Sequence, residues 1–153
     1  MRDLRELILQ RLKAILDGVD GARTVWRDRD DVPPDGTPTL ILLDGRERKL
    51  TATAGGGRRR MPLVEMELTP QVWIQIQPRT DVTNPGVGEE LSGWRQKILS
   101  AVFNDGELAG LQGENGQLQY LGCQTDMEIG SDVIGNMLVD ISLTYLFDPD
   151  DMT

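Results

Sequence analysis

The chain has 153 residues, a normal length for one domain, and its 16 Lys and Arg stand against 25 Asp and Glu for a formal net charge of −9. This acidity argues against broad nonspecific binding to nucleic acid, and the absence of histidine removes the usual general base and the commonest metal ligand. One cysteine, Cys123, excludes an internal disulfide, and no apolar run approaches the roughly 18 residues that a membrane helix needs. We therefore expect one domain, residues 1–153, that is soluble and intracellular when synthesised.

Residues 2–17 have the spacing of an amphipathic helix. Their apolar side chains recur at steps of three and four, and these are Leu4, Leu7, Ile8, Leu12, Ile15 and Leu16. Gly18 follows directly and predicts the end of the helix. Residues 23–27 predict a short strand, and the proline- and aspartate-rich residues 27–36 predict a loop.

The next apolar run, residues 39–43, predicts a central strand because it is continuous rather than alternating. Asp44 and Gly45 predict a turn, and residues 49–53 predict the strand that follows it. A segment of three glycines and three arginines, residues 55–60, then leads into the strongest pattern in the sequence.

Residues 64–76 alternate strictly between two kinds of side chain. The even positions hold Val64, Met66, Leu68, Val72, Ile74 and Ile76, whereas the odd positions hold Glu65, Glu67, Thr69, Gln71, Trp73 and Gln75. Strict alternation predicts a strand with its even positions in the core and its odd positions facing away. Pro70 predicts a bulge or a sheet edge. At about 3.3 Å per residue the strand spans about 40 Å, long enough to project beyond its own domain.

The remaining residues predict a second helix and two more strands. Residues 88–103 predict the helix, and Leu108 with Leu111 fits one further helical turn. The predicted buried stripe of the helix at residues 88–103 is Leu91, Trp94, Ile98, Ala101 and Val102. Residues 118–129 predict a strand, residues 130–136 a connection, and the alternation in 138–147 a last strand.

Strands follow strands directly in this order, so the sheet is expected to be mostly antiparallel. The predicted fold class is therefore α+β: a mostly antiparallel β-sheet with two amphipathic helices packed on one face, and a long β-hairpin. Neither an internal repeat nor a domain linker is evident, which supports one domain over residues 1–153.

No motif in the sequence indicates catalysis. Residues 86–91, GVGEEL, begin like a dinucleotide fingerprint but lack its third glycine and its preceding strand. The acidic clusters in 27–31 and 148–153 lack the spacing of a calcium loop. Glu65 and Glu67 share one strand face and are interpreted as partners for basic groups. We therefore expect no catalytic residue, no cofactor and no bound metal.

The layout resembles the tail terminator, or tail completion, family of siphovirus-type bacteriophages. The resemblance covers nearly the whole chain: the helix LRELILQRLKAIL, the strand TLILLDG, a hairpin, the strand LVEMELTPQVWIQI, the helix ELSGWRQKILSAVF and the strand VDISLTYLF. These are architectural features rather than a catalytic signature. The segments GGGRRR and GLQGENGQLQY match no feature of the family.

The resemblance implies a structural virion protein. Members form a ring, usually a hexamer, at the head-proximal end of the tail tube, where the ring ends polymerisation and prepares the tail for head joining. The implied partners are further copies of the chain, the tail tube protein and the head–tail connector proteins, and DNA would pass through the lumen without specific binding. The implied location is the virion tail or neck, and the host cytoplasm during assembly, with no membrane contact.

Two alternatives remain open from the sequence. The chain could be another neck or head–tail connector ring protein, because such proteins have related layouts. It could also be a soluble, non-catalytic binding module that uses an open sheet face. The size of the protein in solution would separate a ring from a module.

The arginine-rich segment Arg58, Arg59 and Arg60 concentrates positive charge next to three glycines in an acidic chain. It allows three interpretations: a solvated hairpin tip, a loop that contacts DNA in a lumen, and an arm that docks on an acidic surface of a neighbouring subunit or of the tube. We favour the arm, because DNA has to slide through such a channel. Trp73, Glu65 and Glu67 complete the set of predicted interface residues.

Overall fold

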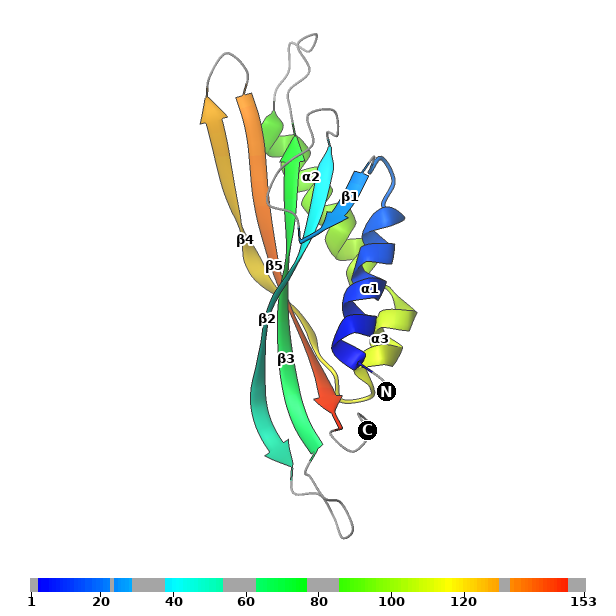
Figure 1. Cartoon of the computed structure of the whole chain (residues 1–153). Helices are drawn as coiled ribbons and strands as arrows, with labels where there is room; N and C mark the ends of the chain where they lie inside the picture. The colour runs from blue at the N-terminus through cyan, green and yellow to red at the C-terminus, as the bar shows by residue number, and fades with distance from the viewer. Residues whose placement is uncertain are drawn as a thin grey trace.

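A five-stranded sheet carries three helices on one side in the computed structural model, which describes residues 3–22, 24–28, 38–53, 63–76, 86–129 and 133–148 (Figure 1). The elements in chain order are α1 (Leu4–Asp17), β1 (Thr24–Arg27), β2 (Thr39–Thr53), β3 (Leu63–Ile76), α2 (Val87–Phe103), α3 (Gly106–Gln112), β4 (Leu118–Ile129) and β5 (Val133–Phe147). The predicted α+β class is confirmed. The short third helix, α3, contains Leu108 and Leu111, where one further helical turn was predicted.

The strands lie in the order β1-β2-β3-β5-β4. The short strand β1 is parallel to β2, and every other neighbouring pair is antiparallel. As a result β2 and β5 run in one direction, whereas β3 and β4 run in the other. The paired strands β2 and β3 extend at one end past the helices (Figure 1).

The alternation predicted for β3 is confirmed, since its even positions are buried from Leu68 to Ile76. Each of these side chains continues a row across the sheet: Val72, for example, pairs with Leu42 on one side and Val139 on the other, and all three are buried. The helices pack on this same face, so the hydrophobic core is one layer between helices and sheet. Val64 and Met66, nearer the projecting end, are half-buried.

The helices begin and end where local chemistry allows. Asp3 caps α1 by accepting a hydrogen bond from the Glu6 amide, and Gly18 ends this helix as predicted. Asp105 caps α3 through the Leu108 amide and also accepts two hydrogen bonds from Arg11 of α1, at 2.9 and 2.6 Å. The two hydrogen bonds join α1 to the start of α3, and the Arg11 guanidinium also lowers the pKa of Asp105.

The predicted turn at Asp44–Gly45 is wrong, because β2 continues without interruption from Thr39 to Thr53. The two residues instead form a β-bulge, where the register with β3 shifts by one position opposite Pro70. Gly45 has φ of +72°, and a Cβ atom there would overlap the Thr69 carbonyl oxygen. An Asp-Gly pair suits a turn and a bulge equally well, because both need a residue in left-handed backbone.

The predicted connection at 130–136 is also too long, because β5 begins at Val133. Gly135 lies within this strand, and a Cβ atom at that position would overlap the Val87 side chain at the start of α2. The glycine therefore allows the helix to approach the sheet closely, and it does not mark a loop here. The predicted stripe of α2 is otherwise confirmed, with Leu91, Trp94, Ile98 and Val102 buried and Ala101 half-buried.

Candidate interaction surface

Among the described residues no helix packs on the second face of the sheet, which we call the open face. A row of large apolar side chains crosses its centre, one from each of four adjacent strands in register. The row consists of Trp26, Ile41, Trp73 and Leu138. Ile41 is buried between its neighbours and the other three are half-buried. Trp73 is therefore part of a continuous aromatic and aliphatic band rather than a lone exposed residue.

Polar side chains on both sides of the apolar row are hydrogen-bonded to one another. Asn136 accepts from the Trp73 indole at 3.2 Å and from the Gln75 amide at 3.1 Å. On the other side, Gln71 donates to Asp140 at 2.6 Å. These bonds link β3 to β5 directly, so the side chains are held in place before any partner binds.

Glu67 is the centre of a further cross-strand group closer to the projecting end. It accepts a hydrogen bond from Arg48 of β2 at 2.8 Å and another from Ser142 of β5 at 3.2 Å. The prediction that Glu67 serves as a partner for a basic group is thus confirmed. Glu65 lies two positions further along the same face of β3, at the level of Leu146.

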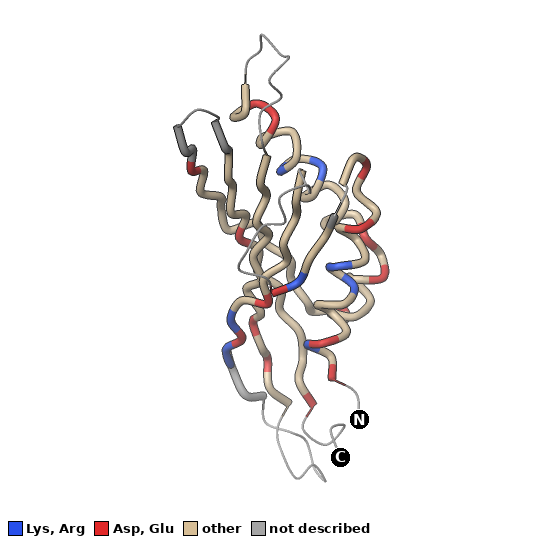
Figure 2. Tube along the Cα trace, turned by 45° about the horizontal axis from the view of Figure 1, so that its top comes forward, with Lys and Arg blue, Asp and Glu red and all other residues tan. Residues whose placement is uncertain are grey.

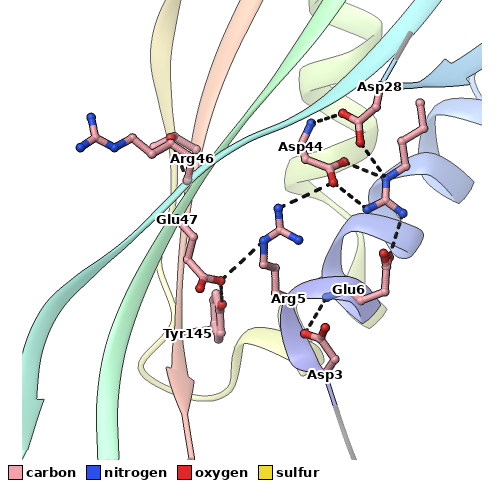
Figure 3. Close-up of polar contacts among 10 residues, drawn as sticks. Asp3, Arg5, Glu6, Asp28, Asp44, Arg46, Glu47 and Tyr145 are labelled. Carbon is pink, nitrogen blue, oxygen red and sulfur yellow. Dashed lines mark hydrogen bonds and ion pairs between the residues drawn. The ribbon is translucent and has the colours of Figure 1, made fainter.

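A cluster of charged residues fixes β2 to the helical layer at the bulge (Figure 3). Arg27 donates two hydrogen bonds to Asp44, at 2.7 and 2.9 Å, and a third to Glu6 of α1 at 2.8 Å. These bonds from Arg27 are the main reason that the pKa values of Asp44 and Glu6 lie below their ordinary range. Because the three residues come from β1, β2 and α1, the cluster joins these elements at the bulge in β2.

The same cluster continues across to β5. Arg5 lies 3.8 Å from Glu47, and the Tyr145 hydroxyl donates a hydrogen bond to the same carboxylate. Burial, together with this bond to Glu47, raises the pKa of Tyr145 well above its ordinary value. In Figure 3 the neighbouring Arg46 points to the opposite side of β2, toward the open face. Successive side chains of β2 therefore point alternately toward the helical layer and toward the open face.

The two edges of the sheet differ in how they are covered. On one edge β1 pairs only with Thr39–Leu42, and the Asp28 side chain closes this pairing by accepting from the Asp44 amide at 2.9 Å. Beyond Asp44, the outer side of β2 pairs with no strand in the described part of the chain. The other edge is β4, whose outer side is likewise unpaired there along all 12 residues.

Trp73, Glu67 and Glu65 all lie on the open face of β3, but Trp73 is in the apolar row and Glu67 is six residues away, in the group with Arg48. Arg58, Arg59 and Arg60 lie outside the described residues. Sequence reasoning missed the contributions of Trp26, Leu138 and Arg48, which reach the open face from other strands. A pairing register would have been needed to find them, because their positions alone show no shared pattern.

Other kinds of site are not evident in the described residues. They contain no group of three or more His, Cys, Asp or Glu placed to hold a metal ion. No helix in this part of the chain is long and apolar enough to cross a membrane. Cys123 is exposed on β4.

Comparison with known proteins gives no relative: no protein-family model matches the chain, and no curated protein does.

Proposed function

We propose that the chain is a structural subunit of a phage tail that assembles into a ring, most simply a hexamer, at the head-proximal end of the tail tube. There it ends polymerisation of the tube and prepares the tail for joining to the head. The sequence resemblance to tail terminator proteins motivates this proposal. Its partners would be copies of itself, the tube protein and the connector proteins, and its place the virion neck, after assembly in the host cytoplasm.

The observation that carries the proposal is the one-sided construction of the sheet. In the described part of the chain the three helices lie on one face, while the open face holds a band of apolar side chains that runs from Trp26 through Trp73 to Leu138. Large aromatic side chains ringed by ordered polar groups are typical of protein–protein contacts. A subunit built to polymerise needs such surfaces on sides that its own helices do not occupy.

The projecting pair of β2 and β3 supplies a second support. These strands extend past the helical layer, and the cluster of Arg27, Asp44 and Glu6 ties β2 to β1 and α1 at their base. In the proposed ring this arm carries Arg58, Arg59 and Arg60 to an acidic surface of the next subunit or of the tube. DNA would pass through the lumen without specific binding.

The test is electron microscopy of purified protein mixed with polymerising tail tubes. The proposal expects rings on one end of each tube and tubes of limited length. A variant with Arg58, Arg59 and Arg60 replaced by alanine should fold normally but no longer cap tubes, and capping by the wild-type protein should weaken at high salt. The matched control replaces Lys13 and Lys97, which lie on the helices, and should cap normally.

Three outcomes would contradict the proposal. Tubes that grow to the same length with and without the protein would remove the terminator role. A protein that binds the head connector but never the tube would favour the alternative, another neck or connector ring protein. Persistence as a monomer in both assays would favour a binding module.

A further inference from the structure

We propose that the uncovered edge of β2 in one copy pairs with the uncovered edge of β4 in the next, so that neighbouring sheets join into one continuous antiparallel sheet. The number of copies that join in this way rests on the ring in the proposed function. The contact between two copies does not depend on that function. The surface is thus assigned to a second copy of this chain.

Both edges are uncovered among the described residues, and β4 is the one that lacks most of the features that normally prevent strand pairing. An isolated protein protects an edge strand by keeping it short, by placing lysine or proline on it, or by covering it. β4 has 12 residues and contains neither lysine, arginine nor proline, and Gln119–Leu121 and Cys123–Asp126 are exposed. The free part of β2 after the first bulge, residues 46–53, is shorter and carries Lys49. A second bulge lies in it between Lys49 and Thr51, and β4 has one between Tyr120 and Gly122.

The two edges carry opposite charge. Residues 46–53 of β2 hold Arg46, Arg48 and Lys49 against Glu47, a net charge of 3 − 1 = +2. β4 holds Asp126 and Glu128 with no basic residue, a net charge of −2. Figure 2 shows the basic residues where β2 leads to the projecting end and an acidic residue on β4 toward the opposite end of the sheet. The basic edge of β2 attracts the acidic edge of β4 in another copy, whereas two β2 edges or two β4 edges repel each other. This favours head-to-tail rather than two-fold contacts.

The strand directions agree with this pairing. Three antiparallel steps separate β2 from β4 within one sheet, from β2 to β3, from β3 to β5 and from β5 to β4. β4 therefore runs opposite to β2. A neighbour related by rotation about a ring axis presents its strands at the same inclination to that axis, so the new contact is antiparallel.

The offset between the two edges matches that of a closed sheet. Within one copy, Arg48 pairs with Glu67 and Glu67 pairs with Thr144, so Arg48 is level with Thr144 of β5. Gln124 pairs with Leu138 of β5. Placing Arg48 of one copy opposite Gln124 of the next therefore shifts the neighbouring copy by 144 − 138 = 6 residues along β5. Six residues at about 3.3 Å measure about 20 Å, and four strands at about 4.8 Å measure about 19 Å across. The strands would then tilt by about 45°, near the 35–45° usual in closed barrels.

Neighbouring registers are less favourable. A one-residue slip would place side chains of the open face against side chains of the helical face, so only shifts by two residues are allowed. Shifting by two in one direction sets Arg46 opposite Gln124 and leaves Asp126 without a basic residue opposite it, and shifting by two in the other raises the tilt to about 54°. The six-residue offset instead sets Arg46 opposite Asp126 on the open face, and Lys49 opposite Cys123 on the helical face.

The opposition of Lys49 and Cys123 gives a direct test, because directly opposed residues of antiparallel strands are close enough for a disulfide. In the Lys49→Cys variant, mild oxidation should yield a ladder of covalent multimers that a reductant removes. The matched control is Arg48→Cys, one residue away on the same strand but on the opposite face, which should give little beyond background. Lys49→Cys combined with Cys123→Ser should lose the ladder. Equal ladders from the two cysteine variants, or no ladder from either, would overturn the proposal.

A charge exchange tests the same contact without cysteine. Arg46→Asp and Asp126→Arg should each weaken self-association about tenfold in light scattering, and the double variant should regain most of it. Additive losses in the double variant would count against the register. If the ladder forms but tubes are not capped, the tail function fails and the contact stands; if tubes are capped without a ladder, the contact fails and the function stands.

Discussion

The two faces of the sheet differ in what their side chains contact. Behind the helices, aliphatic side chains from β2, β3 and β5 form one buried layer that holds the subunit together. On the open face, the side chains of the same strands are bonded sideways to one another, as Trp73 is to Asn136 and Gln71 is to Asp140. A single alternating strand thus fills the core with one set of positions and leaves the other set on the open face, which is the face that we propose for assembly. Substitutions at adjacent residues of β3 should therefore have separable effects.

The largest effect is expected from Ile74 and its neighbour Trp73. Ile74 is fully buried, so Ile74→Ala should lower the free energy of unfolding by about 2–5 kcal/mol through the cavity that it leaves. Trp73→Ala removes a half-buried side chain and should cost less, about 1–2 kcal/mol, while weakening assembly more. Urea unfolding of the monomer measures the first effect and light scattering the second. A larger loss of stability from Trp73→Ala than from Ile74→Ala would break the assignment of the two faces.

The second, smaller effect compares a glycine in the β2 bulge with a glycine in α2. Gly45→Ala should cost about 1–3 kcal/mol, because alanine disfavours its backbone conformation and its Cβ would meet the Thr69 carbonyl oxygen. Gly93→Ala is the matched control, since it lies in α2 with no atom near the added methyl group. It should instead stabilise the protein by about 0.5–1 kcal/mol. Thermal unfolding of both variants measures the difference, and a neutral Gly45→Ala would mean that the bulge is not specified by this glycine.

The smallest effect concerns pH and the cluster at the base of the projecting strands. Asp44 and Glu6 have folded-state pKa values below their ordinary values of 3.8 and 4.5. Their contribution to stability is therefore complete above those ordinary values and is lost as the pH falls through the lower, folded-state values. Between pH 6 and pH 3 the free energy of unfolding of the wild type should fall by about 1 kcal/mol more than that of Arg27→Met. The difference is modest because these groups are partly screened by solvent. Parallel pH profiles in urea unfolding would show that Arg27 does not hold the cluster.

Much of the architecture could be predicted because it depends on local patterns. The alternation of β3 identified its buried positions, and the spacing of Leu4, Leu7 and Ile8 identified α1. The bulge at Gly45 could not be separated from a turn, since both place a residue in left-handed backbone. Whether the strand continues depends on β3, which lies about twenty residues further along the chain.

The candidate surface was only partly predictable for the same reason. Alternation alone indicated that Trp73 and Glu67 face away from the core, and Glu67 was expected to have a basic partner. Which partner it has, Arg48, follows from the register between β2 and β3. The alignment of Trp26 with Leu138 involves four strands and more than a hundred residues of sequence separation, and no local pattern encodes it.

Hydrogen exchange of the protein, free and bound to tail tubes, tests the central claim that the open face and its two edges form the assembly surface. We expect backbone amides in residues 46–53 of β2 and in β4 to exchange more slowly in the assembled protein, because they gain partners in the new ladder. Amides of α1, α2 and α3 should be unchanged. Slower exchange confined to the helices, with both edges exchanging as in the free protein, would contradict the account.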